Sequence, residues 1–171
     1  MQRIVVVYFS RDGHTRSVAR EIADACSAEI DEITERGDRR GPRGYLRSAL
    51  EAVLGWCPDL KPARHTPEPD DLLVIGTPIW FWNMASPVRS YLEAHRGRFG
   101  RVAFFCTCGG SGQDKVLHDL KTLCHRRPIA SLALTESECE QGAHAAVLAD
   151  FVRELRRGQP MARMAHVAPH G

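Results

Sequence analysis

Residues 3–9 have the sequence Arg3-Ile4-Val5-Val6-Val7-Tyr8-Phe9, and this apolar, β-branched run decides the fold. Such a run is typical of a strand that is buried on both faces of a parallel sheet. A polar loop over residues 10–16 follows it, and then the spacing of apolar residues changes. One helical face is shared by Val18, Ala19, Ile22, Ala23 and Cys26. This part of the chain therefore predicts a strand, a loop and a covering helix.

The alternation of strand and helix continues to the end of the pattern. Further strands are predicted over residues 29–33, 72–77, 101–107 and 129–134. Amphipathic helices are predicted over residues 45–54, 88–92, 116–123 and 147–155, with Gly55 as the end of the first of them. Strands and helices that alternate in this way force parallel pairing through right-handed crossovers. We therefore predict an α/β fold, a doubly wound parallel sheet with helices on both faces.

Length and composition are those of a single globular domain. The 171 residues are 43% hydrophobic and 26% charged, with a formal net charge of +2, far from the strongly basic footprint of a nucleic-acid binder. We expect one domain over residues 1–157 and a loosely held tail over residues 158–171. The apolar runs are too short for a signal peptide or a membrane span, so the expected location is the cytoplasm.

Six cysteines, at positions 26, 57, 106, 108, 124 and 139, are best explained as reduced thiols inside the fold. A zinc site built from Cys106, Cys108, Cys124 and His125 is the alternative. The chain has no Cys-x-x-Cys pair, and structural zinc sites usually show that tighter spacing. We therefore predict no metal site.

Ligands of doubly wound sheets bind outside the carboxyl ends of the strands, and three loops that follow predicted strands of this chain are candidates for such a site. The first is Ser10-Arg11-Asp12-Gly13-His14-Thr15-Arg16. Hydroxyls, a glycine and the N–H groups of a helix start are the parts of a phosphate cradle. Capping of the helix by Ser10 or Thr15 is the alternative. The loop lacks the Gly-Lys-Ser/Thr of Walker loops and the Gly-x-Gly-x-x-Gly of dinucleotide folds.

The second loop runs from Gly76 to Pro87 and carries Trp80, Phe81 and Trp82 in succession. Three adjacent aromatic side chains on a loop make an apolar surface on which a planar heteroaromatic ring would stack. The alternative is a loop that packs on the protein's own core or on a partner.

The third loop, residues 107–113, contains paired glycines, which let backbone amides approach a ligand closely. A plain flexible turn is the alternative. Together the three loops offer phosphate donors, stacking aromatics and polar edge contacts, and they converge on one site.

These motifs resemble the flavodoxin family. Residues 8–15 resemble its phosphate loop, residues 76–87 its isoalloxazine loop, in the quinone-reductase branch above all, and residues 107–112 its ring-edge loop. The likeness covers nearly the whole chain apart from the tail and the Gly-rich loop near Gly41. It implies a five-stranded sheet of order 2-1-3-4-5 and FMN as the cofactor.

The resemblance also implies the residues that contact the cofactor. The phosphate would be lined by Ser10, Arg11, Asp12, Gly13, His14 and Thr15. The ring would be flanked by Thr77, Pro78, Ile79, Trp80, Phe81, Trp82 and Asn83. Its pyrimidine side would meet Thr107, Cys108, Gly109, Gly110, Ser111 and Gly112. Asp12 departs from the family, which often has Thr there, because a carboxylate repels a phosphate. Either it points outward, offset by Arg11 and Arg16, or the affinity for phosphate is reduced.

Two functions follow from the resemblance. One is an FMN-dependent oxidoreductase that passes electrons from a reduced nicotinamide or a partner reductase to a quinone-like acceptor. The other is a flavodoxin-type electron shuttle that serves a partner protein. The flavin would carry the chemistry, so no catalytic side chain is predicted. A homo-oligomer is compatible with either function.

Two features favour the oxidoreductase over the shuttle. Flavodoxin shuttles are usually acidic, whereas this chain is slightly basic. Residues 78–86 contain no glycine, and a loop of bulky residues should change its peptide orientation less readily, although Gly109 or Gly110 could supply such a peptide. An Arg-Asp-Gly also occurs in flavodoxin-like protoporphyrinogen oxidases, but the chain lacks their long insertion. A ligand-sensing module explains the aromatic loop less well.

Overall fold

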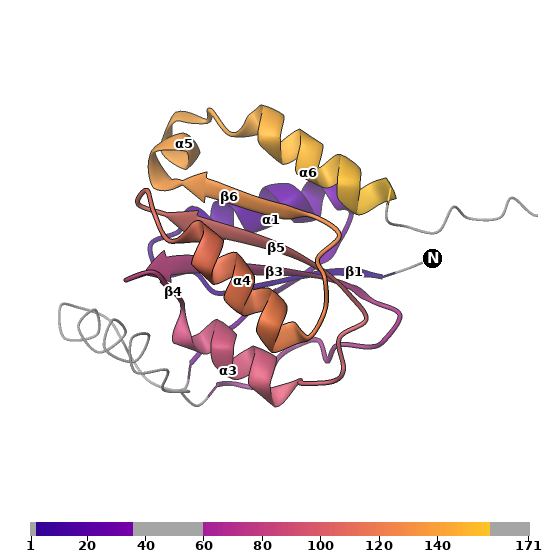
Figure 1. Cartoon of the computed structure of the whole chain (residues 1–171). Helices are drawn as coiled ribbons and strands as arrows, with labels where there is room; N and C mark the ends of the chain where they lie inside the picture. The colour runs from indigo at the N-terminus through magenta and orange to yellow at the C-terminus, as the bar shows by residue number, and fades with distance from the viewer. Residues whose placement is uncertain (1–2, 36–59, 158–171) are drawn as a thin grey trace, which may run out of the picture.

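The computed structural model describes residues 3–35 and 60–157. Its central sheet contains the parallel strands β1 (Ile4–Tyr8), β2 (Glu29–Glu32), β3 (Leu72–Trp80), β5 (Arg101–Cys108) and β6 (Ser131–Thr135). Their order in space is β2-β1-β3-β5-β6, and Figure 1 shows that helices cover both sides of the sheet. Counted among the parallel strands alone, this is the order 2-1-3-4-5. The predicted fold class is confirmed.

Each face of the sheet carries its own pair of long helices. On one face lie α1 (His14–Cys26) and α6 (Ala145–Arg157), and on the other lie α3 (Ser86–Ala94) and α4 (Gln113–Cys124). The strand over residues 4–8 is buried on both sides, because Val5 and Val7 pack toward α3 and α4 while Val6 packs toward α1. The unbroken apolar run at the start of the chain is explained by these two covered faces.

The structure corrects the prediction for the aromatic loop. Strand β3 does not end at Thr77 but continues to Trp80, and a short strand, β4 (Asn83–Met84), pairs with it antiparallel. The aromatic segment is thus a tight hairpin. Gly76, which the sequence analysis includes both in the strand over residues 72–77 and in the loop, lies within β3 opposite Tyr8 and Phe105. The reason is local: β-branched and aromatic residues extend the strand, and pairing across the turn holds it.

A second element absent from the prediction is the short helix α5 (Glu136–Gln141), which follows β6 directly. Its start is a reciprocal capping box between Thr135 and Glu138, a Thr-x-x-Glu pattern that is visible in the sequence. The predicted helix over residues 45–54, the loop over 36–44, Gly55, Cys57 and the tail over 158–171 lie outside the described residues.

Among the described residues, no helix is long and apolar enough to cross a membrane. Within residues 3–35 and 60–157, there is no group of three or more His, Cys, Asp or Glu residues that could hold a metal ion. Cys106 and Cys124 are buried, and burial raises the pKa of each thiol to about 12. Both thiols are therefore protonated at neutral pH.

An ion pair ties the first two central strands together where they begin. Arg3, just before β1, donates from Nε and Nη2 to the two carboxylate oxygens of Asp71, just before β3, at 2.9 and 2.7 Å. The backbone N–H of Glu68 also donates to this carboxylate, at 2.9 Å. The Arg3 guanidinium holds the pKa of the buried Asp71 carboxyl below its usual value.

This pair predicts how stability depends on pH. The pKa of Asp71 is lower in the folded chain than in the unfolded chain, where it is about 3.9. The contribution is therefore complete above about pH 5 and is lost as the pH falls through the lowered folded-state pKa. Urea unfolding at neutral pH should show a loss of about 1–3 kcal/mol for Asp71→Asn. Acidification should then cost this variant less stability than it costs the wild type. Asp24→Asn, on the exposed side of α1, is the control, and equal acid losses in all three proteins would contradict the prediction.

Candidate functional site

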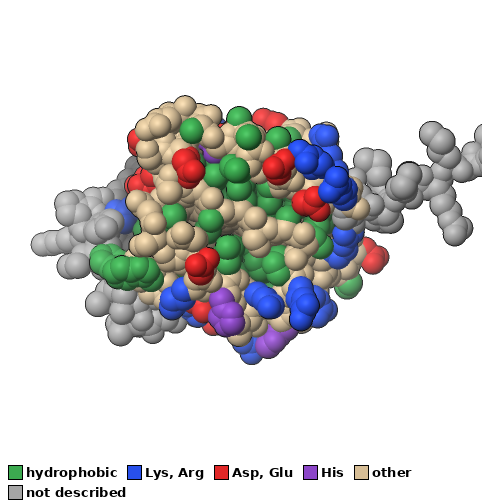
Figure 2. All heavy atoms as spheres, turned by 45° about the horizontal axis from the view of Figure 1, so that its top comes forward, with side chains coloured by type: hydrophobic (Ala, Val, Ile, Leu, Met, Phe, Trp, Pro, Cys, Tyr) green, Lys and Arg blue, Asp and Glu red, His purple; other side chains and the backbone are tan. Residues whose placement is uncertain are grey.

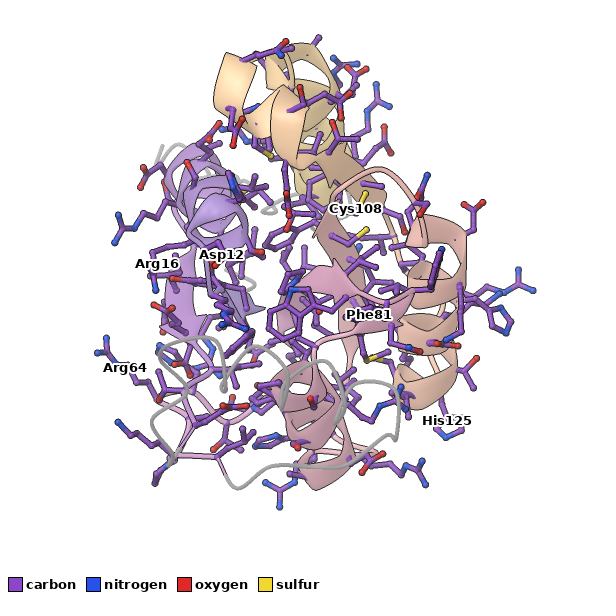
Figure 3. The ribbon with its side chains drawn as sticks, turned by 90° about the vertical axis from the view of Figure 1, so that its left-hand side faces the viewer. Asp12, Arg16, Arg64, Phe81, Cys108 and His125 are labelled. Atoms are coloured by element: carbon purple, nitrogen blue, oxygen red, sulfur yellow. The ribbon has the colours of Figure 1, made fainter. Side chains whose placement is uncertain are left out.

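A cavity of about 440 Å³ lies at the carboxyl edge of the sheet, within the size range of small-molecule sites. It is lined by Asp12, Ile79, Trp80, Phe81, Trp82, Gly109, Gly110, Ser111 and Glu136. Figure 3 views this edge, and its labelled Asp12, Phe81 and Cys108 come from the three loops that the sequence singles out. The structure thus brings these loops together, as expected for a doubly wound sheet.

The first loop leaves the start of α1 open. Gly13 is the N-cap residue, and no side chain caps the helix, so the alternative of capping by Ser10 or Thr15 is wrong. The first turn of α1 also contains no acidic side chain. Ser10 is buried, and its Oγ has no hydrogen-bond partner among the described residues. Unpaired helix N–H groups and an unpaired buried hydroxyl are suited to an anion.

The charged residues of the first loop are arranged around this helix start. The Asp12 side chain is 66% exposed, and its Oδ1 lies 4.0 Å from Nε of Arg11. Arg16 does not offset Asp12, because its guanidinium is engaged with Glu32 on β2, with Nε 3.3 Å from Oε2. Nε2 of His14 lies 3.7 Å from a carboxylate oxygen of Glu140 on α5. The Asp12 carboxylate is therefore largely exposed to solvent and close to Arg11, while Asp12 still lines the cavity.

The hydroxyls of Thr15 and Thr107 tie the first loop to the third. The two Oγ1 atoms lie 2.8 Å apart, and both side chains are buried. Thr77 is also buried, where its Oγ1 accepts from the backbone N–H of Ala85 and donates to the carbonyl of Pro78. These three predicted site residues make bonds within the protein that hold the loops in place.

The turn of the β3–β4 hairpin has an unusual backbone. Trp80 pairs with Asn83 across it, and the two residues between them, Phe81 and Trp82, have φ angles of 49° and 59°. Hairpin turns with two positive φ angles favour Asn-Gly, because other side chains are strained there. For each aromatic residue the cost is about 1–2 kcal/mol. Two bulky residues of this loop thus adopt positive φ angles, at a steric cost that glycine would not have.

The three aromatic side chains of the hairpin differ in burial. Trp80 is partly buried and packs against the core, with its ring edge-on to Phe9 at a centroid distance of 5.8 Å. Phe81 and Trp82 are 51% and 60% exposed. Hydrophobic side chains project at the left edge of Figure 2, the side of the strand ends in Figure 1. Trp80 thus serves the core, while the other two rings are free to contact a ligand.

One residue that lines the cavity was missed by sequence reasoning. Glu136 lines the cavity from the start of α5. Its position directly after the end of a strand could have identified it, because ligands bind at this edge of the sheet. Gly109, Gly110 and Ser111 line the cavity as predicted positions of the third loop, while Cys108 is buried at the end of β5. The charged side chains that line the cavity, Asp12 and Glu136, are both acidic. The basic cluster at residues 39–43 lies outside the described residues.

The fold and this site define an α/β protein with a phosphate-type helix start and an aromatic wall at the switch point of its sheet. The chain belongs to the flavodoxin family, because the model of that family matches residues 3–137. This assignment confirms the resemblance found in the sequence and supports FMN as the cofactor.

Relatives with assigned names are similar to part of the chain. An NAD(P)H dehydrogenase (quinone) of Syntrophus aciditrophicus is 32% identical over 108 residues, which are 59% of this chain and 52% of that protein. One of the same name from Trichlorobacter lovleyi is 29% identical over 99 residues, 54% and 48% of the respective chains. The chain thus spans about half the length of the curated relatives it matches.

Solved structures share the fold at lower sequence identity. A flavoprotein from Lactobacillus acidophilus in complex with FMN has a TM-score of 0.66 and 21% identity, covering 84% of this chain and 99% of that chain. Oxidised flavodoxin 1 from Bacillus cereus has a TM-score of 0.53 and 15% identity, covering 93% and 100%. At these identities the likeness shows the fold alone.

The residues present fit FMN on observations of this structure. The open start of α1 and the buried Ser10 hydroxyl suit its phosphate. The exposed rings of Phe81 and Trp82 suit its planar ring system. The side-chain oxygen Oε1 of Gln113, at the start of α4, is buried without a partner among the described residues and is one more polar atom beside the third loop. The roles of the individual residues stay predictions.

The different burial of Trp80 and Trp82 gives a test of which ring contacts the cofactor. We expect Trp82→Ala to weaken FMN binding by about 1–3 kcal/mol, the usual contribution of aromatic stacking, with little change in Tm. Trp80→Ala should lower Tm instead, because it removes a ring packed on Phe9 and the core. Fluorescence titration with FMN and thermal unfolding measure the two effects. Unchanged FMN affinity in both variants would assign these rings to the core or to a subunit interface.

Proposed function

We propose that this chain is an FMN-dependent oxidoreductase that passes electrons from a reduced nicotinamide, or from a partner reductase, to a quinone-like acceptor. The observation that carries the proposal is the cavity at the carboxyl edge, where Phe81 and Trp82 line a wall and remain more than half exposed. Aromatic rings that are both exposed and part of a cavity offer stacking surface to a planar acceptor as well as to a cofactor. The names of the two relatives described above support the same activity.

The chain's own residues would bind and orient the reactants. Helix α1 and Ser10 would hold the phosphate with backbone N–H groups and a hydroxyl. Gly109 and Gly110 would let the backbone approach the ring edge closely, because glycine has no side chain in the way. The space beside each of them is open, since a Cβ built there would have no protein atom within 4 Å. The bound flavin itself would supply the electron-transfer chemistry.

The electron shuttle remains the second candidate, and one observation favours it. The exposed aromatic tip of the hairpin, Phe81 and Trp82, is the kind of surface that protein partners bury. The two candidates differ in the acceptor: the oxidoreductase reduces a small quinone-like molecule, whereas the shuttle passes its electrons to a partner protein.

The phosphate assignment predicts a difference between FMN and riboflavin. FMN should bind more tightly, because charge-assisted hydrogen bonds at the start of α1 require the phosphate. Ser10→Ala should weaken FMN binding by about 1.5–3 kcal/mol and leave riboflavin binding unchanged, since it removes only a hydroxyl donor to a charged group. Calorimetric titration measures both ligands. Ser17→Ala, exposed on α1, is the matched control. Equal affinities for the two flavins would overturn the phosphate assignment.

Turnover decides between the two functions. With FMN bound, we expect the protein to oxidise NADH or NADPH in the presence of a soluble quinone, under anaerobic conditions and without any other protein. Phe81→Ala should raise the KM for the quinone by roughly 5- to 150-fold, which corresponds to the 1–3 kcal/mol of one stacking contact. The absorbance of the nicotinamide follows the reaction. No quinone reduction with either nucleotide, and none when a flavodoxin reductase keeps the bound flavin reduced, would favour the shuttle.

A further inference from the structure

Burial of the two side chains in the core does not hold the strained turn at Phe81 and Trp82. Both residues have left-handed φ angles, yet both rings are more than half exposed, so core packing does not fix them. The side chain of Asn83, the first residue of β4, bonds to the turn, and Lys115 on helix α4 bonds to Asn83.

Asn83 and Lys115 form a relay to the turn. The amide Nδ2 of Asn83 donates to the backbone carbonyl of Phe81 at 2.7 Å. Nζ of Lys115, on the first turns of α4, donates to Oδ1 of the same amide at 2.8 Å. Lys115 is held in turn by Asp119, one helical turn further on, with Nζ 2.7 Å from Oδ2. The chain of contacts runs from α4 through one amide to the carbonyl of the turn.

The chemistry of lysine gives this relay a direction. An ammonium group only donates hydrogen bonds, so the Asn83 atom that faces it must be the oxygen. The amide nitrogen is then directed at the Phe81 carbonyl, which can only accept. With the amide reversed, two oxygens would face each other at the turn and the ammonium would face an NH₂ group. Lys115 therefore reinforces the one orientation of Asn83 in which its amide nitrogen donates to the Phe81 carbonyl, and Asn83 holds the Phe81–Trp82 peptide.

Helix α4 also supports the turn by shape. Its N-cap residue is Gly112, and a Cβ built there would lie 3.0 Å from Cα of Trp82 and 3.1 Å from Cγ2 of Ile79. The hairpin therefore packs on backbone at the start of α4, three residues before Lys115. The same helix start holds the turn through close packing and through a hydrogen-bond relay.

We propose that Lys115 is a positioning residue, which acts through Asn83 to fix the strained aromatic turn in its binding geometry before the cofactor arrives. The consequence for affinity rests on the proposed function, since it concerns FMN. Where the binding-competent geometry is only part of an ensemble, the apparent dissociation constant rises by the inverse of its population. Loss of the Lys115 hydrogen bond should thus weaken FMN binding, even though Lys115 does not line the cavity.

The first arm of the test uses the protein without FMN. Backbone ¹⁵N relaxation of Trp82 should give an order parameter near 0.85 in the wild type and below about 0.6 in Lys115→Met, which keeps the length of the side chain and removes the donor. Lys115→Arg should restore order. Asn83→Asp should loosen the turn as well, although it strengthens the attraction to Lys115, because it removes the donor to Phe81. A merely electrostatic role of Lys115 would leave Asn83→Asp ordered and would overturn the relay.

The second arm measures FMN affinity in the same variants. We expect Lys115→Met and Asn83→Asp to raise the FMN Kd by about tenfold, as for a turn that is competent one tenth of the time. Lys121→Met, which removes an exposed lysine from the same helix, should match the wild type. An ordered Trp82 in Lys115→Met, or a mobile Trp82 with unchanged Kd, would overturn the proposal. A wild-type protein that binds no FMN would instead overturn the proposed function, and the relaxation arm would still decide whether the relay holds the turn.

Discussion

The double pairing of β3 is the constraint on which the rest of the structure depends. This strand is hydrogen-bonded in parallel to β1 on one side and to β5 on the other, with Gly76 opposite both Tyr8 and Phe105. Parallel strands in register end at the same edge, so the loops after β1 and β5 are placed on either side of the hairpin that continues β3. Gly76 is required in this row, since a Cβ there would lie 2.0 Å from Cζ of Phe105. The position of the site is therefore determined by the register of β3 with β1 and β5.

Sequence reasoning was most successful where a single periodicity governs a whole element. The buried run over residues 4–8 and the helical face of Val18 and Ile22 are fixed by covered faces, and both elements formed as predicted. The convergence of the three loops also followed, because parallel topology alone determines it. Positions that depend on the sheet's covered faces and strand ends were thus visible in the sequence.

What escaped prediction depends on contacts between elements. No pattern within residues 76–87 shows that Asn83 will pair with Trp80 and meet Lys115, which is 32 positions further along the chain. The hydroxyls of Thr15 and Thr107 are similar: each suggests a ligand contact by itself, and only the fold shows that they bond to each other. Glu136 was missed although the sequence contains signals for it. It lies within the Thr135–Glu138 capping box and directly follows a strand that ends at the cavity. Whether a side chain of one element points at a side chain of another depends on the tertiary structure, and the periodicity of a single element does not predict it.

The electrostatics of the site suggest how an anion can be held beside carboxylates. Asp12 and Glu136 line the cavity, and Arg16 is committed to Glu32, so paired cations are not the main attraction that these residues offer. The open start of α1 supplies partial positive charge from aligned peptide groups instead. That charge is fixed in place and falls off within one turn, whereas the exposed carboxylate of Asp12 is screened by water. A site of this kind favours an anion that fits against backbone N–H groups over one attracted by net charge. If the site holds the FMN phosphate as proposed, shape and hydrogen bonding would contribute more to its selectivity than the slight overall basicity of the chain.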